Sequence, residues 1–295
     1  MTLKGIRMIY VICNPTAASG HAVQTGEMID ALLEKKGIEH RTVRTERPGH
    51  ATELARRAAE NGAETILSIG GDGTALEVAK GLIGTESALG IIPAGTGNDF
   101  VKTLGIPRDP AAALDYILCH RARLTDAGEV SGQLFLNEVG TGFDVSVLDY
   151  AARAKRYVRG ILPYLYGVLR TLFRFRSVPV TWSADGGEPV ETDIFVVAAG
   201  NGGIIGGGIP IAPEARADDG LLDVVIVGRI PRRKLPARLV GLMKGKILEF
   251  PETTWLRARS VRFSIPGGRI NVDGEIPEMK EAEVRILPGA LRIHR

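Results

Sequence analysis

Apolar and polar positions repeat in two different patterns along the first third of the chain. Four short runs are typical of buried strands, namely RMIYVIC (7–13), EHRTVRT (39–45), TILSI (65–69) and ALGII (88–92). Other stretches repeat apolar positions every three to four residues, as helices do, at 26–36, 51–60, 74–82 and 109–118. Strands that alternate with helices of about ten residues predict a parallel sheet with helices on both faces.

After about Thr125 the pattern changes to strand-like runs separated by Gly, Pro and Asp. These runs are QLFLNEV, VPVTWSA, DIFVVAA, LLDVVIV, SVRFSI, RINV, AEVRIL and ALRIH. In SVRFSI apolar and polar residues alternate, which is typical of a half-buried antiparallel strand. Helical insertions are predicted at about 149–175 and 231–246. The second part of the chain is therefore predicted to be a β-rich domain.

Length and charge narrow the possible functions only a little. With 295 residues the chain is long enough for two domains. Its 37 basic and 34 acidic residues nearly cancel, so the overall charge gives no sign of a nucleic-acid partner. The five histidines show no metal-ligand spacing, and we expect them in loops or at the surface.

Cysteine usage and hydropathy predict a cytoplasmic protein. Cys13 and Cys119 lie in apolar surroundings without a CxxC spacing, which predicts buried, reduced thiols. The uncharged stretch 194–213 contains six glycines and two prolines, so it predicts a strand and a loop rather than a membrane-spanning helix. The apolar run near the N-terminus is too short for a secretory signal.

A glycine-rich loop, GGDGT (70–74), follows the run TILSI and opens a predicted helix. Backbone N–H groups at the start of a helix are unpaired and converge, and glycines let an anion approach them closely, so the loop suits phosphate. The carboxylate of Asp72 would repel a triphosphate unless a divalent cation lay between them, which predicts metal-assisted nucleotide binding. The alternative is a tight turn in which Asp72 or Thr74 only caps the helix.

Three further strand ends carry small or polar residues. PAGTGNDF follows the next predicted strand, and two glycine-rich turns at neighbouring strand ends are where ligands bind in open α/β folds. The alternative is that Thr96, Asn98 or Asp99 caps the next helix. NPTAASG, which begins at Asn14, and Thr45 at the end of EHRTVRT are weaker candidates for phosphate or ribose contacts.

Two acidic motifs stand in the second part of the chain. Asp219, before LLDVVIV, belongs either to a turn or to a site for a hard cation held by its carboxylate and nearby carbonyl oxygens. RINVDGEIP places Asp273 and Glu275 on either side of Gly274. Asp-Gly is a hairpin signal. A hairpin tip can also present a carboxylate that accepts a hydroxyl proton during phosphoryl transfer, a role that contributes about 10² to 10⁴-fold.

GGDGT, PAGTGNDF, GGGIPIAPEARADDGLLDVVIV and NVDGE, in this order and spacing, resemble the diacylglycerol kinase catalytic family, especially its soluble bacterial lipid kinase branch. GGDGT alone is shared with NAD kinases and is similar to a phosphofructokinase loop, but the four motifs together are specific. The resemblance spans nearly the whole chain. It implies an α/β nucleotide-binding domain at 1–125, with a three-layer parallel sheet as in those two families. It also implies a β-rich, sandwich-like domain at 126–287, an active site in the cleft between the domains, and residues from about 288–295 that return to the first domain.

The same resemblance implies an ATP-dependent lipid kinase that uses Mg²⁺ and phosphorylates a lipid hydroxyl, that of diacylglycerol or a related lipid alcohol. Glu275 would accept the hydroxyl proton, Asp273 would support the metal and the base, and Asp72 would organise the catalytic magnesium. The residues implied for ATP binding are Asn14, Pro15, Thr16, Thr45, Gly71, Asp72, Gly73, Thr74, Ala75, Leu76, Glu77, Thr96 and Asn98. Those implied for a structural magnesium are Asp219, through its carboxylate, and Arg216 and Leu221, through carbonyl oxygens.

Two features depart from the family pattern. Leu76 stands where the family often has Asn, and NPTAASG is longer than the usual NPxSG, so contacts at these places do not carry over directly. Two other functions stay open: an NAD-kinase-like phosphotransferase and a catalytically inactive nucleotide or lipid sensor. NVDGE and the basic apolar segments favour a lipid substrate, and the three acidic residues Asp72, Asp273 and Glu275 argue against a sensor.

A lipid substrate requires access to a membrane. The first candidate segment surrounds the apolar ILPYLYGVL with Arg153, Lys155, Arg156, Arg159, Arg170, Arg174 and Arg176, and the second is PRRKLPARLVGLMKGK. Each basic side chain near an anionic leaflet contributes about 1 kcal/mol. The alternative is domain packing with solvated arginines. We expect a cytoplasmic enzyme of phospholipid biosynthesis with transient contact at the inner face of the cell membrane, no nucleic-acid partner, and a homodimer among the possible assemblies.

Overall fold

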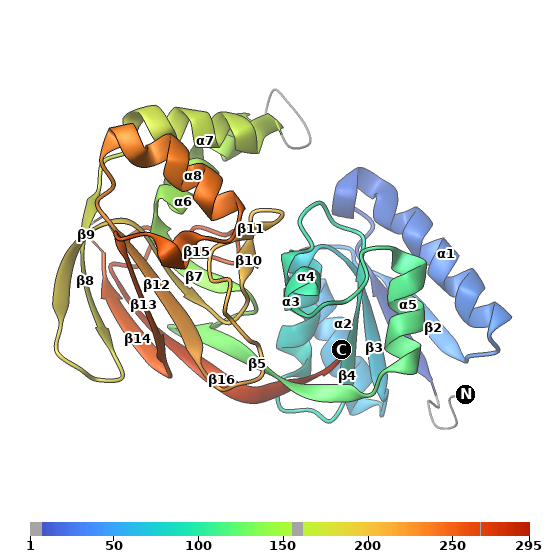
Figure 1. Ribbon diagram of the computed structural model, residues 1–295. Helices are drawn as coiled ribbons and strands as arrows, with labels where there is room; N and C mark the ends of the chain where they lie inside the picture. Colours follow the sequence, from blue (N-terminus) through green and yellow to red (C-terminus); the bar gives the residue numbers. More distant parts are fainter. Residues whose placement is uncertain (1–7, 155–161, 266) are drawn as a thin grey trace. The chain divides into compact units, whose positions relative to one another are not determined.

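The computed structural model describes residues 8–154, 162–265 and 267–295, which form two compact units (Figure 1). Unit 1 comprises Met1–Ala127 and Pro288–Arg295, and unit 2 comprises Gly128–Leu287. The N-terminal unit has an α/β architecture, and the other unit is dominated by antiparallel strands. This arrangement confirms the fold class predicted from the sequence.

The centre of unit 1 is a parallel sheet in which β4, β3, β1 and β2 lie side by side in this order. Its strands are β1 (Ile9–Cys13), β2 (His40–Arg44), β3 (Thr65–Gly70) and β4 (Ala88–Pro93). Nearly every residue of β1, β3 and β4 is buried, as expected for strands covered on both faces. The C-terminal part of β16 (Glu281–His294) adds to the sheet, since Arg292 and Ile293 pair in parallel with β4.

Helices cover both faces of this sheet. One face is packed by α1 (His21–Lys35) and α5 (Pro110–Cys119), and the other by α2 (His50–Glu60) and α3 (Asp72–Leu82) (Figure 1). The short α4 (Asp99–Thr103) follows the second glycine-rich loop. The 3₁₀ turn η1 (Ala17–Gly20) leads directly into α1, so this helix begins five residues before the predicted start at Gly26.

Two predictions for unit 1 were wrong. Cys119 is exposed, because it is the last residue of α5 and lies on the outer side of the helix, whereas Cys13 is buried as expected. His294 is not a surface residue. Its imidazole is buried between the Thr65 hydroxyl at 3.2 Å and the His120 carbonyl oxygen at 2.8 Å, and burial lowers its pKa.

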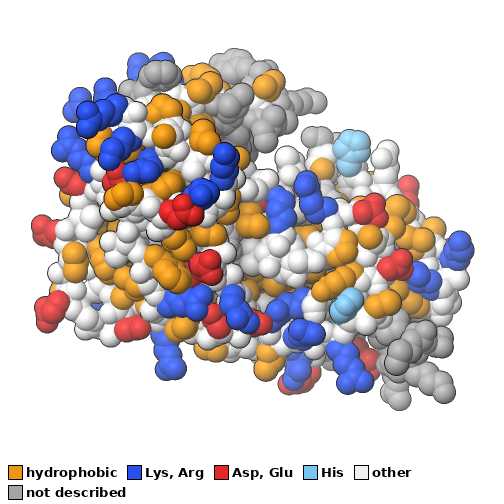
Figure 2. All heavy atoms as spheres, viewed as in Figure 1, with side chains coloured by type: hydrophobic (Ala, Val, Ile, Leu, Met, Phe, Trp, Pro, Cys, Tyr) orange, Lys and Arg blue, Asp and Glu red, His pale blue; other side chains and the backbone are white. Residues whose placement is uncertain are grey.

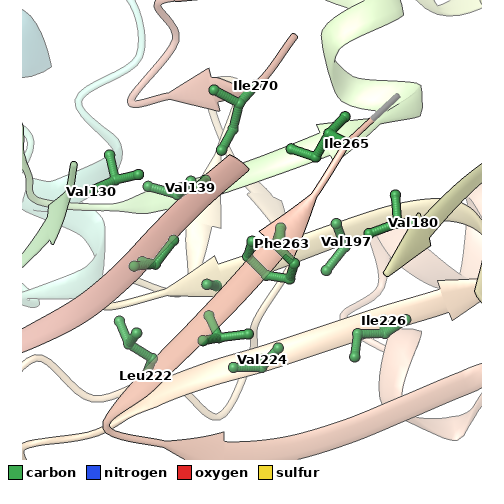
Figure 3. Close-up of a cluster of buried hydrophobic side chains, with 14 of the residues drawn as sticks. Val130, Val139, Val180, Val197, Leu222, Val224, Ile226, Phe263, Ile265 and Ile270 are labelled. Atoms are coloured by element: carbon green, nitrogen blue, oxygen red, sulfur yellow. The ribbon is translucent and has the colours of Figure 1, made fainter. Parts of the chain in front are cut away.

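Unit 2 is built from antiparallel strands around a large apolar core. Its strands are the C-terminal part of β5 (Ala122–Val130), β6 (Gln133–Phe135), β7 (Glu138–Gly142), β8 (Val178–Ala184), β9 (Val190–Gly200), β10 (Ile204–Ile205), β11 (Ile209–Pro210), β12 (Leu222–Gly228), β13 (Thr253–Ala258), β14 (Ser260–Ser264), β15 (Asn271–Val272) and most of β16. Figure 3 shows Phe263 among Val139, Val197, Val224 and Ile270. Four of these side chains come from different strands and Ile270 directly precedes β15, so the core holds the antiparallel layers together.

Helices cover a second apolar cluster of unit 2, on the other face of β9 and β12. They are α6 (Phe143–Ala154), α7 (Leu162–Arg174) and α8 (Leu235–Met243), with the short 3₁₀ turns η2 (Arg232–Lys234) and η3 (Ile247–Glu249). The aromatic rings of Phe143, Phe175 and Phe195 meet in this cluster at centroid separations of 4.6 to 5.7 Å. The helices therefore belong to the fold of unit 2 rather than to a detached insertion.

The structure corrects three details of the pattern-based prediction. The helical stretch expected at 149–175 contains two helices, and α6 already begins at Phe143, directly after β7. AEVRIL and ALRIH belong to one strand, β16, because Gly289 accepts the positive φ of 58° at the Pro-Gly interruption. Strands β5 and β13 were not predicted, since polar residues interrupt their apolar pattern.

Candidate active site

The carboxyl ends of the parallel strands bring several predicted nucleotide residues to one edge of the sheet in unit 1. The Asn14 N–H donates to the Ile69 carbonyl oxygen at 3.0 Å, and its Nδ2 donates to Thr74 Oγ1 at 3.1 Å. The Thr45 N–H donates to the Cys13 carbonyl oxygen at 2.9 Å. Since β1, β2 and β3 are adjacent, their end loops form one continuous surface at the position where open α/β sheets bind ligands.

The two glycine-rich loops touch each other through backbone atoms. A Cβ atom at Gly95 would lie 2.3 Å from the Gly71 Cα, so no larger residue fits there without displacing a loop. Asn98 braces the second loop, because its Oδ1 accepts from the Gly95 N–H at 3.1 Å and its Nδ2 donates to the Gly95 carbonyl oxygen at 2.9 Å. This contact lies next to the start of α3, and backbone N–H groups at the start of a helix can bind an anion.

Asp72 links these two loops. Its Oδ1 accepts from the Phe100 N–H at 3.0 Å, so the carboxylate caps the start of α4 and not its own helix α3. Burial raises the pKa of Asp72, the Phe100 N–H opposes this shift, and the nearby Asp99 carboxylate raises the pKa further. Lys102 pairs with Asp99 at 2.9 Å. A cation beside Asp72 would relieve this unfavourable burial of negative charge, so the carboxylate fits a magnesium-linked role.

Other predicted nucleotide residues have structural partners of their own. Asn14 Oδ1 accepts from the N–H and the hydroxyl of Thr16 at 3.1 and 2.8 Å. The Glu77 carboxylate accepts from the backbone N–H groups of Gly49 and Ala51 at 3.0 and 3.2 Å, and so holds the start of α2. The contacts of the predicted nucleotide residues with ATP stay a prediction, and so do the contacts expected at Pro15, Gly73, Ala75, Leu76 and Thr96.

NVDGE forms a tight hairpin in unit 2. Val272 and Glu275 exchange backbone hydrogen bonds of 2.8 and 2.9 Å, and the two residues between them, Asp273 and Gly274, have φ values of 47° and 91°. Two successive left-handed residues are the signature of the two-residue turn that the Asp-Gly pair predicted. Glu275 is exposed at the end of this turn. Its place leaves the carboxylate accessible for a proton-accepting role, which stays a prediction.

The Asp273 side chain anchors the hairpin to the start of β7. Its Oδ2 accepts from the Leu136 N–H at 2.6 Å, and its Oδ1 accepts from the N–H groups of Asn137 and Glu138, each at 2.9 Å. A carboxylate that receives several backbone N–H groups is held firmly. Asp273 therefore fixes the position of the turn that carries Glu275, while its predicted support of a metal ion stays a prediction.

A buried polar group beneath the hairpin was missed by sequence reasoning. Asn271 Oδ1 accepts from the Gly274 N–H at 2.8 Å, and its Nδ2 donates to Glu138 Oε1 at 2.8 Å and to Asp144 Oδ2 at 3.1 Å. Burial raises the pKa of Asp144 to about 6, and the Val145 N–H and the Asn271 amide oppose the shift. Polar residues within otherwise apolar strands were the signal for this group.

Asp219 has the features of a hard-cation ligand. Its Oδ1 accepts from the Leu221 N–H at 3.1 Å, which is the turn foreseen from the sequence. Its Oδ2 is buried and receives no hydrogen bond from the described residues, although the Arg257 guanidinium lies 3.9 Å away. Within the described part of the chain no three His, Cys, Asp or Glu residues cluster as a metal site. A cation here would thus combine one carboxylate with carbonyl oxygens, as the predicted set with Arg216 does.

The predicted site residues fall into two groups. The nucleotide loops and Asp72 belong to unit 1, whereas Asp219, Asp273 and Glu275 belong to unit 2. Within unit 1 the structure gathers the strand-end loops, and within unit 2 it joins Asp273 and Glu275 in one hairpin. The convergence of both groups in one active site stays a prediction.

Two helices of unit 2 combine exposed apolar and basic side chains (Figure 2). The exposed apolar residues are Leu162, Tyr166 and Leu169 on α7 and Val240 and Met243 on α8. The exposed basic residues on or beside these helices are Arg153, Arg170, Arg174, Arg176, Arg232, Arg233, Lys234, Lys244 and Lys246. Lys155, Arg156 and Arg159 of the predicted segment lie outside the described residues. None of the described helices has the length and apolar character needed to cross a membrane.

Comparison with known proteins relates both units to one group of enzymes. The diacylglycerol kinase catalytic domain model matches residues 8–130, and the model of the YegS C-terminal NAD kinase beta sandwich-like domain matches residues 137–295. The chain is 31% identical over 296 residues to a protein of Mycobacterium tuberculosis named diacylglycerol kinase, covering 98% of this chain and 96% of that protein.

Two further relatives agree. The chain is 36% identical over 254 residues to a Pseudomonas aeruginosa protein named "Probable lipid kinase YegS-like", covering 83% of this chain and 81% of that protein. The crystal structure of a diacylglycerol kinase from Bacillus anthracis superposes with a TM-score of 0.81 at 26% identity, over 98% of this chain and 97% of that chain.

Proposed function

The chain belongs to the diacylglycerol kinase family and is a lipid kinase, and from this premise we propose that it transfers the γ-phosphoryl group of ATP to the hydroxyl of diacylglycerol or a related membrane lipid. The observation that carries the proposal is the direct packing of two glycine loops, at Gly71 and Gly95, with the buried Asp72 linking them. This arrangement suits a phosphate chain whose charge is shared with a cation.

Unit 1 would bind and orient the nucleotide. Backbone N–H groups at the start of α3 would hold phosphate oxygens, and Asn14 and Thr45, at neighbouring strand ends, would contact ribose or phosphate. Asp72 would hold Mg²⁺, directly or through water, and Mg²⁺ when bound would neutralise the negative charge of the phosphates. Positioning and charge neutralisation supply most of the catalysis in phosphoryl transfer.

Unit 2 would supply the base. The lipid oxygen would attack the γ-phosphorus, the bond between this phosphorus and the bridging oxygen would break to release ADP, and the hydroxyl proton would pass to Glu275. Asp273 would keep the hairpin in place through its three backbone hydrogen bonds. This step requires both units to contribute to one active site, which we propose lies between them.

We assign a second, structural cation to Asp219. Its buried Oδ2 lacks a hydrogen bond from the described residues, and carbonyl oxygens of Arg216 and Leu221 would complete the oxygen set. Calcium or magnesium added to the metal-stripped protein should therefore raise its melting temperature, and Asp219→Asn should remove this response. An equal response in both proteins would contradict the assignment.

The exposed faces of α7 and α8 would bring the enzyme transiently to an anionic lipid surface. Apolar side chains that enter the headgroup region, together with basic residues that meet anionic lipids, bind such a surface reversibly. In a vesicle flotation assay with phosphatidylglycerol-containing membranes, Tyr166→Glu and Leu169→Glu should each lower the bound fraction several-fold. Val190→Glu, at an exposed apolar position on β9, is the matched control and should bind as the wild type does. Equal binding of all variants would refute the membrane face.

A transfer assay with labelled ATP distinguishes the competing functions. The acceptor panel contains diacylglycerol, monoacylglycerol, a sphingoid base, ceramide, phosphatidylglycerol and NAD. The proposal expects label in at least one lipid and none in NAD. Label in NAD alone would support an NAD-kinase-like phosphotransferase, and the absence of label from every acceptor, with ATP bound, would support a sensor.

A further inference from the structure

The side chain of Asn271 joins the hairpin of Glu275 to a pair of acidic residues. Its Oδ1 receives the Gly274 N–H, and its two Nδ2 protons point to Glu138 Oε1 and Asp144 Oδ2 at 2.8 and 3.1 Å. Asn271 itself is only 5% exposed. Both N–H groups of this amide donate a hydrogen bond and its oxygen accepts one.

The chemistry of the partners fixes the orientation of the amide. A backbone N–H can only donate, so the oxygen of Asn271 must face Gly274. The amide nitrogen then lies between two carboxylates, where its protons offset their mutual repulsion. A Cβ atom at Gly140 would lie 3.1 Å from Glu138 Oε2 and 3.3 Å from Asp144 Oδ2, which shows how closely the two acids approach the same point of β7.

We propose that Asn271 is the positioning residue for Glu275. Its amide holds the Gly274 N–H, and with it the turn, at a place set by the Glu138–Asp144 pair, while Asp273 secures the same turn from the side of β7. The inference rests on the proposed role of Glu275 as proton acceptor. Displacing a reacting group by about 1 Å can slow an enzyme about 10²-fold, so a support of this kind matters for turnover.

Several charged groups lie on α6 and on the elements packed against it. Asp144 Oδ1 is buried and receives no hydrogen bond from the described residues. On the same helix Asp149 is already paired with Arg269. The other charged residues on described elements packed against α6 are Glu191 and Asp193 on β9 and Arg170 and Arg174 on α7. The two arginines are exposed. Asn271 donates one hydrogen bond to each acid of this pair.

Asn271→Asp is the decisive variant because it has the same shape. Its first oxygen still accepts from the Gly274 N–H, but its second oxygen meets Glu138 and Asp144 and needs a proton to stay there. We expect kcat at about pH 8 to fall about 10- to 10²-fold, with the KM for ATP unchanged, and to recover as the pH falls to about 6. Adding Glu138→Gln should restore a donor at the shorter contact and recover much of the loss at pH 8.

Hydrogen exchange of the Gly274 amide gives a readout that does not depend on activity. Asn271→Ala removes the acceptor and should speed this exchange at least about tenfold, whereas Asn271→Asp should keep it slow at low pH. Unchanged exchange in Asn271→Ala would overturn the inference. So would a pH-independent loss of kcat in Asn271→Asp that Glu138→Gln does not rescue. If instead Glu275→Gln has wild-type turnover, the proposed base fails while the exchange result still decides the role of Asn271.

Discussion

Replacing Asp273 tests whether its carboxylate holds the hairpin in place. Asp273→Gly removes the side chain while leaving a residue that adopts the φ of 47° without strain, so it isolates the three hydrogen bonds to residues 136–138. Asp273→Asn keeps an oxygen acceptor but places an NH₂ group opposite one of the N–H donors. Asp273→Ala loses the hydrogen bonds and also adds the steric penalty of a left-handed residue.

The size of each effect follows from these contacts. A hydrogen bond to a charged group contributes about 1.5 to 3 kcal/mol, and the site is partly exposed, so three bonds at the lower end suggest a loss of about 4 kcal/mol for Asp273→Gly. Asp273→Asn should lose about 2 kcal/mol, since one donor is left facing another donor. Asp273→Ala should be the least stable, by about 1 kcal/mol more than the glycine variant.

Urea unfolding followed by circular dichroism measures these differences as changes in the free energy of unfolding. Ser131→Gly is the matched control, because Ser131 has nearly the same φ, 48°, in the turn between β5 and β6. It should change stability by no more than about 0.5 kcal/mol. If Asp273→Gly and Asp273→Asn were as stable as the wild type, the anchoring role of the carboxylate would be refuted.

Two more predictions concern the glycine loops and the buried acid pair. Gly95→Ala should raise the KM for ATP about tenfold or more and lower the free energy of unfolding by about 1 to 3 kcal/mol, because the new Cβ would lie 2.3 Å from the Gly71 Cα. The control is Gly73→Ala, which should not lower stability because a Cβ there meets no atom within 4 Å. Equal stability of the two variants would contradict the packing argument. The pKa of Asp144 is about 6 in the fold against an ordinary 3.8, so the folded state binds more protons between these values and its stability falls as the pH rises through them. Asp144→Asn removes this penalty. In urea titrations, its free energy of unfolding relative to the wild type should therefore increase from about pH 4 to pH 7 by up to about 3 kcal/mol. A difference that does not depend on pH would contradict the raised pKa of Asp144.

Much of the fold and part of the site could be predicted because they depend on local patterns. Strand runs, glycine loops and the Asp-Gly turn each occupy a few consecutive residues. Asp72 shows where this reasoning stops: its carboxylate caps α4, 28 positions away in the chain, and no local pattern indicates that contact. The amide of Asn271 likewise meets Glu138 only because β15 pairs with β7. His294 is buried because β16 enters the first sheet.

The central claim is tested most directly by the rate at which label passes from ATP to diacylglycerol in mixed vesicles, measured for the wild type, Glu275→Gln and Glu278→Gln. Glu278 is another exposed glutamate shortly after the same turn, so its variant controls for the loss of a surface charge. We predict transfer by the wild type and by Glu278→Gln, and a rate at least about 10²-fold lower for Glu275→Gln with ATP binding retained. Equal rates in the wild type and Glu275→Gln, or label that enters NAD and no lipid, would contradict the account.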